Sequence, residues 1–130
     1  MNEAYQMVKH FQKTAGQPVS EFPQQLSKER VSLRAKWILG ELNEFMSASN
    51  REDQADALTD ILYYLIGAYV EMGIRPDPLF RIVHDSNMKK INSPDGITKD
   101  ETGKVLKPSD WKHPNDEIKE AIHLMEILAQ

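Results

Sequence analysis

The chain has 130 residues, a formal net charge of −4 and no cysteine. This length predicts a single domain over residues 1–130 with a small core, and the acidic balance argues against a nucleic-acid binder. Without cysteine, a disulfide framework, a thiol nucleophile and a zinc–thiolate site are all excluded. No apolar run approaches the roughly 20 residues that span a bilayer, and the apolar block of a signal peptide is missing. We therefore expect a cytoplasmic protein that binds neither nucleic acid nor a membrane.

Apolar residues recur at helical spacing through most of the chain, which predicts an all-α fold, a bundle of about five helices. The predicted helices are Asn2–Thr14, Ser27 to about Ser49, Arg51–Met72, Asp77 to about Lys90, and a last helix that begins at Pro114. Asn50 is suited to cap the third helix and Gly73 to end it. Asp77 followed by Pro78 predicts the N-cap and the first residue of the fourth helix.

Residues 92–113 differ in composition from the helices and are rich in Gly, Pro, Asp, Lys and Thr. Residues 97–99 and 104–106 flank a polar tetrapeptide, which predicts either a small hairpin or an irregular loop. Basic residues are concentrated between Arg81 and Lys112. One interpretation is a cationic segment that contacts a polyphosphate, with each lysine as a point charge on an oxygen. The alternative is an ordinary solvated surface.

The helix predicted over Arg51–Met72 is apolar nearly all round, which predicts burial on several sides. Asp60 lies within it, and a buried carboxylate costs several kcal/mol unless it has a partner or a metal. The apolar surface of this helix exceeds what one small bundle can cover. Because large exposed apolar patches are rare on monomers, this apolar surface also predicts a homodimer or a higher homo-oligomer.

Two acidic pairs lie in consecutive predicted helices. Glu41 and Glu44 are three residues apart, and Asp56 and Asp60 are four apart, so each pair shares one helix face. If these helices pack together, four carboxylates meet, and such a cluster persists only with shared protons or a bound cation. Oxygen ligands without Cys or His favour Mg²⁺, with Mn²⁺ as the alternative, and such an ion favours a phosphate-bearing substrate. The other interpretation is a set of solvated acids on amphipathic helices.

Several ordered motifs resemble one known family. They are Leu33-Arg34, Glu41-Leu42-Asn43-Glu44, the segment from Asp56 to Tyr64 with Gly67, the segment from His84 to Lys90, and the tail with Asp95-Gly96, Gly103-Lys104, Lys107-Pro108 and Pro114. Together they resemble the all-α nucleoside triphosphate pyrophosphatases, closest to the MazG-like and phosphoribosyl-ATP pyrophosphohydrolase-like branch. The resemblance extends from about Val8 to Pro114.

The resemblance implies an activity. Family members bind Mg²⁺ through a Glu-x-x-Glu pair on one helix and an acidic pair on the next, and cleave nucleoside triphosphates to the monophosphate and pyrophosphate. Glu41 and Glu44 match the first pair. The second pair aligns either as Asp56 with Asp60 or as Asp53 with Asp56. Gly40 stands where many members have an additional glutamate.

We therefore predict a Mg²⁺-dependent nucleoside triphosphate pyrophosphohydrolase. Its predicted metal ligands are Glu41, Glu44, Asp56 and Asp60, with Glu41 and Glu44 also as the catalytic residues. Its predicted substrate-binding residues are Asn87, Lys90, Lys104 and Lys107, with Arg34 and Lys36 as further candidates. Two alternatives stay open: a non-catalytic nucleotide- or metal-binding helical regulator, and a phosphoribosyl-ATP pyrophosphohydrolase, which keeps the chemistry and changes the substrate.

Overall fold

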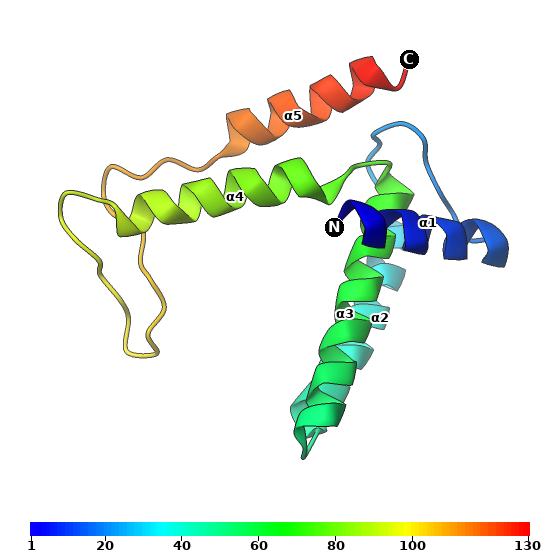
Figure 1. Ribbon diagram of the computed structural model, residues 1–130, viewed down its shortest axis with the longest axis horizontal. Coiled ribbons are helices and arrows are strands. Elements are labelled where there is room, and N and C mark those ends of the chain that lie inside the picture. The colour runs from blue at the N-terminus through cyan, green and yellow to red at the C-terminus, as the bar shows by residue number, and fades with distance from the viewer. The chain divides into compact units, whose positions relative to one another are not determined.

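The computed structural model describes residues 1–130 and contains five α-helices and no β-strand (Figure 1). The helices are α1 (Asn2–Ala15), α2 (Lys28–Ser47), α3 (Arg51–Met72), α4 (Pro76–Ile91) and α5 (Asn115–Leu128). The prediction of an all-α fold with five helices is confirmed. No single helix is long and apolar enough to cross a membrane, although the consecutive helices α3 and α4 taken together meet that criterion by length and composition alone.

The chain divides into two compact units, one made of Met1–Pro76 with Met125–Gln130 and the other of Asp77–Leu124. That the whole chain forms one domain stays a prediction. In the first unit, α3 contacts both α1 and α2. Figure 1 shows α2 and α3 running in opposite directions as a helical hairpin, joined by residues 48–50.

The apolar core of the first unit is small. Tyr5 and Val8, three residues apart on α1, pack against Ile66 and Val70, four apart on α3. All four side chains are almost fully buried, and Val70 is completely inaccessible. Both spacings place each pair on one helix face, which is why these two helices meet along a single stripe.

The prediction that α3 is buried on several sides is wrong for the single chain. Leu58, Leu62 and Leu65 are 50%, 48% and 41% exposed, although all three are large and apolar. The reason is that only α1 and α2 contact α3 extensively within the chain, and they leave much of its circumference uncovered. Periodicity reports how apolar a helix is, but it does not say which partner covers it.

The ends of α3 follow their predicted chemistry, whereas the start of α4 does not. The Asn50 side chain accepts a hydrogen bond from the Asp53 backbone N–H at 2.8 Å. Gly73 adopts the left-handed conformation, with φ of 68°, that glycine tolerates best. The predicted N-cap at Asp77 with Pro78 as first residue is wrong, because α4 begins at Pro76. Proline suits the first helical position through its fixed φ, and Asp77 then lies in the first turn, where its charge is favoured.

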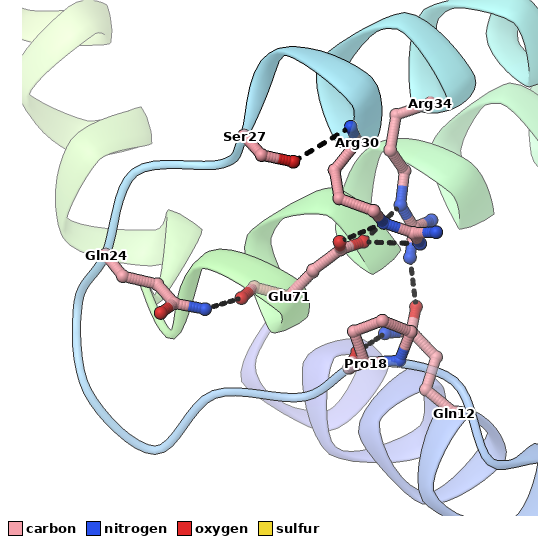
Figure 2. A network of polar contacts seen from close by, with 7 residues as sticks. All are labelled: Gln12, Pro18, Gln24, Ser27, Arg30, Arg34 and Glu71. Carbon is pink, nitrogen blue, oxygen red and sulfur yellow. Dashed lines mark hydrogen bonds and ion pairs between the residues drawn. The ribbon is translucent and has the colours of Figure 1, made fainter.

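A buried polar network ties the three helices of the first unit together (Figure 2). The Glu71 carboxylate on α3 accepts hydrogen bonds from both Arg30 and Arg34 on α2, the latter at 2.8 Å. Arg34 also donates to Gln12 Oε1 on α1 at 3.1 Å, and Gln12 Nε2 donates to the Pro18 carbonyl at 2.8 Å. Arg34, a further candidate for substrate binding, is therefore committed to holding the fold together.

Gly67 is required where this network crosses α3. A Cβ added there would lie 2.5 Å from Gln12 Oε1 and 2.7 Å from Arg34 Nη1. Both side chains are buried, and the Arg34 Nη2 atom donates a hydrogen bond to Gln12 Oε1. We expect Gly67→Ala to lower the free energy of unfolding by about 1–3 kcal/mol through overpacking, despite the better helix propensity of alanine. Gly40→Ala on α2 is the control, since nothing lies within 4 Å of its added Cβ, and it should stabilise by up to about 1 kcal/mol. Urea unfolding of both variants measures this, and an undiminished stability of Gly67→Ala would contradict it.

The second unit contains the segment that joins α4 to α5. An isolated antiparallel bridge pairs Lys99 with Val105. The turn between them is built on Asp100, whose Oδ1 accepts hydrogen bonds from the backbone N–H groups of Thr102 and Lys104 at 2.8 and 3.0 Å. These bonds, with that of the Thr102 hydroxyl first, lower the pKa of Asp100. A short hairpin turn therefore forms within the irregular segment that the composition predicted.

Candidate metal and nucleotide site

Three of the predicted metal ligands meet between α2 and α3. Each of Glu41, Glu44 and Asp60 offers a carboxylate oxygen, and these oxygens all lie within 4.8 Å of one another. Glu41 and Glu44 reach the same spot because they are three apart on α2, and the helical hairpin brings Asp60 of α3 opposite them. We call these three residues the acid trio.

The acid trio carries negative charge that no ion pair within the first unit neutralises. Glu41 is half-buried, and its Oε2 is shielded from solvent without a hydrogen-bond partner. Burial raises the pKa of Glu41, followed by the charge of Glu44 and a side-chain hydrogen bond with it, and then by the charges of Asp60 and Asp56. No trio member forms an ion pair with Lys or Arg. An orphaned buried oxygen among converging carboxylates fits a hard divalent cation, which prefers oxygen ligands.

Asp56, the fourth predicted ligand, is not a member of this cluster. It is exposed and lies one helical turn before Asp60 on α3. Its side chain lines a separate cavity of about 260 Å³ together with Glu44 and Asp53. Glu44 therefore belongs to the acid trio and also lines a cavity with Asp53 and Asp56, the two aspartates that the alternative alignment pairs. That Asp56 binds metal stays a prediction.

A cavity of about 280 Å³ adjoins the acid trio, since Glu41 and Asp60 form part of its wall. Its remaining lining residues are Phe11, Gln12, Gln17, Arg34, Tyr63 and Tyr64. The rings of Phe11 and Tyr63 meet edge to face with centroids 5.7 Å apart. The sequence analysis missed this cavity. Its only sequence signal is the spacing of Tyr63 and Tyr64, three and four residues after Asp60.

The predicted substrate-binding residues all belong to the second unit, whereas the acid trio belongs to the first. Lys90 and Lys107 lie over one ring, that of Trp111, with Nζ atoms 4.9 and 5.0 Å from its centroid. The side chains of Asn87 and Lys104 are exposed. The structure thus brings together two of the four residues, and a role in substrate binding stays a prediction for all of them.

Comparison with known proteins identifies the class of this fold and site. The sequence profile of the phosphoribosyl-ATP pyrophosphohydrolase family matches residues 8–87, which include α2, α3 and the whole acid trio. The match covers more than half of the chain, and the chain belongs to this family, within the all-α nucleoside triphosphate pyrophosphatase superfamily. The family implies a hydrolase that acts on a pyrophosphate bond. A comparison with curated proteins found no match.

Proposed function

We propose that the protein is a Mg²⁺-dependent nucleoside triphosphate pyrophosphohydrolase, which converts a nucleoside triphosphate to its monophosphate and pyrophosphate. The observation that carries this proposal is the acid trio, which forms no ion pair, beside a cavity whose wall also contains the aromatic rings of Phe11, Tyr63 and Tyr64. A polyphosphate needs its charge neutralised, and a nucleoside needs an aromatic and hydrogen-bonding surface. The acid trio would neutralise the polyphosphate through a bound metal ion, and the neighbouring cavity would offer the nucleoside its aromatic and hydrogen-bonding surface.

Glu41, Glu44 and Asp60 would hold the ion, and Asp56 is a further candidate ligand. When bound, Mg²⁺ supplies charge neutralisation at the phosphates and acidifies a coordinated water. Glu41 and Glu44 are the candidate catalytic residues, because a carboxylate in hydrogen-bond reach of the attacking water can take its proton.

The cavity favours a plain nucleoside over a phosphoribosylated one. Its one cationic residue, Arg34, is committed through Nε to Glu71 and through Nη2 to Gln12. Tyr63, Tyr64 and Gln17 line it without any side-chain hydrogen bond inside the chain, so a base or a sugar can pair with them. Phosphoribosyl-ATP carries a further phosphate at its phosphoribosyl end, and this cavity has no free cation to receive it. We therefore place nucleoside triphosphates ahead of phosphoribosyl-ATP as substrates.

Pyrophosphate release tests the proposal. The full chain is incubated with ribo- and deoxynucleoside triphosphates and with phosphoribosyl-ATP, with Mg²⁺, with Mn²⁺ and with chelator. Pyrophosphate and phosphate are then measured separately. We expect pyrophosphate and monophosphate in equal amounts, only with metal, and faster from a nucleoside triphosphate than from phosphoribosyl-ATP. Phosphate as the product would contradict the proposed cleavage, and binding without hydrolysis would favour the non-catalytic regulator.

We expect the protein to be a homodimer or a higher homo-oligomer. The large apolar side chains Leu58, Leu62 and Leu65 on α3 are between 41% and 50% exposed, and Leu39 and Leu42 on α2 are 56% and 40% exposed. A monomer rarely leaves such a surface uncovered. Sedimentation velocity at micromolar concentration should give at least twice the chain mass, and Leu62→Glu should shift the protein toward monomer. A monomeric wild-type protein would contradict this expectation.

A further inference from the structure

Gln17 lies in the wall of the cavity beside the acid trio, directly after the end of α1. Its backbone N–H donates to the Gln12 carbonyl at 2.8 Å, and Gly16 before it adopts the left-handed conformation with φ of 72°. The next residue, Pro18, accepts a hydrogen bond from Gln12 Nε2 at 2.8 Å (Figure 2). Gln12 is 2% exposed and is itself held by Arg34. The backbone of Gln17 is therefore fixed from both sides.

The side-chain amide of Gln17 is half-buried and forms no hydrogen bond within the chain. Because its backbone is already fixed, no backbone freedom is lost when a ligand binds to this amide. The other uncharged polar groups that stay free on the same wall are the hydroxyls of Tyr63 and Tyr64. A hydroxyl rotates, and an amide can turn over, so each of these groups donates or accepts as its partner requires. The free polar groups of this wall do not select one direction of hydrogen bond.

The surroundings of the Gln17 amide suit a nucleobase. The rings of Phe11 and Tyr63 meet at 83° with centroids 5.7 Å apart, which forms a corner where a flat ring can stack. Glu41 and Asp60 on the same wall belong to the acid trio, so a bound metal ion would draw the phosphates there and away from the neutral amide. Base edges carry donors and acceptors side by side in one plane, and a planar amide offers the same arrangement.

We propose that Gln17 binds the hydrogen-bonding edge of the nucleobase, and that the enzyme accepts amino and keto bases alike. This inference rests on the proposed function. Adenine and cytosine present an amino group where guanine and uracil present a keto oxygen, and the amide meets either by turning over. A wall with a one-way group would reject half of these bases, because an unpaired polar group is costly in a closed site. We expect kcat/KM for ATP, GTP, CTP and UTP to agree within about tenfold.

Gln17→Leu keeps a side chain of similar size and removes both hydrogen-bonding groups. We expect KM for ATP and for UTP to rise about tenfold and kcat to change less than about twofold, because the base edge is bound alike before and during the reaction. The rise should disappear with methyl triphosphate, which has no base. Gln25→Leu is the matched control, since Gln25 is an exposed residue of the same segment outside the cavity wall, and it should leave KM for ATP within about twofold.

Gln17→Glu tests the two-way hydrogen bonding. A carboxylate only accepts, and guanine is the common base with two neighbouring N–H donors on its edge, N1–H and N2–H₂. GTP should therefore become the preferred substrate of this variant by about tenfold or more. Comparison of the four triphosphates within one variant cancels the repulsion between the new carboxylate and the phosphates, because that repulsion acts on all four alike.

Equal losses of Gln17→Leu with ATP and with methyl triphosphate would overturn the proposal. A loss with ATP that is absent with dATP would also overturn it, because the amide would then bind the ribose 2′-hydroxyl. So would an unchanged order of the four substrates in Gln17→Glu, or a wild type that prefers one base beyond the expected range.

An absence of pyrophosphate release by the wild type from every nucleotide would instead overturn the proposed function. Calorimetry with α,β-methylene-ATP and with tripolyphosphate then tests the amide separately from hydrolysis. Gln17→Leu should weaken binding of α,β-methylene-ATP about tenfold and leave binding of tripolyphosphate within about twofold. Equal binding of α,β-methylene-ATP by the wild type and Gln17→Leu would contradict the role of Gln17.

Discussion

Glu44→Gln and Asp60→Asn are each expected to reduce pyrophosphate release by more than about 100-fold, since loss of an outer partner of a metal ligand already costs about 10–100-fold. Each change removes one charged oxygen donor from the acid trio, whose carboxylate oxygens lie within 4.8 Å of one another. In the absence of metal the same change removes like-charge repulsion. The metal-free variants should therefore melt at the same temperature as the wild type or higher.

This combination of lost activity with undiminished stability separates a functional site from a structural one. Pyrophosphate release, Mn²⁺ binding by calorimetry and thermal melting with chelator should be measured on the same preparations. Glu52→Gln serves as the control, because Glu52 is an exposed acid on α3 outside the acid trio, and it should behave like the wild type. Retained activity in both variants would show that these acids are only part of the helix surface. Loss of activity together with a lower melting temperature would show a structural role.

Glu71→Gln is expected to lower the free energy of unfolding by about 3–5 kcal/mol, the usual cost of breaking a buried ion pair on one side. Glu71 is 2% exposed and accepts hydrogen bonds from both Arg30 and Arg34. Glutamine cannot neutralise these two guanidinium groups, and Arg34 would be left as a buried, uncompensated charge. A loss of this size is a large fraction of the 5–15 kcal/mol that stabilises a typical domain.

Urea unfolding of Glu71→Gln measures this loss, and Glu52→Gln is again the matched control. Glu52 also pairs with an arginine, Arg51, but both side chains are exposed, so its loss should cost less than about 1 kcal/mol. Equal effects of the two substitutions would contradict the structural role of Glu71. Rescue of Glu71→Gln by 500 mM salt would also contradict it, because a buried pair is screened little.

The contribution of Glu71 should also depend on pH. Burial alone would raise the pKa of Glu71, but the hydrogen bonds and charges of Arg30 and Arg34 outweigh burial and lower it below its ordinary value of 4.5. The stabilisation is therefore fully present above about pH 4.5 and is lost as the pH falls through the lower pKa of the folded state. The stability difference between wild type and Glu71→Gln should stay constant from pH 7 to pH 5 and shrink in more acidic solution. A stability difference between wild type and Glu71→Gln that grows on acidification would contradict this prediction.

Local patterns in the sequence predicted the helices well. Periodicity placed all five helices, and the chemistry of Asn50 and Gly73 identified both ends of α3. The spacing of Glu41, Glu44 and Asp60 predicted that they share helix faces, and the hairpin of α2 and α3 brought them together. These features depend on residues close in sequence, which is why pattern analysis can find them.

Features that depend on distant residues were not predictable in this way. Glu71 looks like a surface acid in the sequence, and only packing shows that two arginines of α2 surround it. Gln12 and Phe11 reach the cavity beside the acid trio from α1, a helix without any acidic motif. The start of α4 was misplaced because two prolines stand two residues apart, and local chemistry alone does not choose between Pro76 and Pro78.

The helical hairpin of α2 and α3 has a consequence for how the site assembles. All three acids lie in two consecutive helices joined by residues 48–50, so their encounter closes only a short loop of chain. Short loops lose little entropy on closure, and contacts that are local in sequence form early and fast. The Glu71 network, by contrast, joins residues that are farther apart in the sequence, since Arg30 and Arg34 precede Glu71 by 41 and 37 residues. The acid trio can therefore come together during synthesis as soon as α3 has been made, and its three negative charges then favour early capture of a divalent cation.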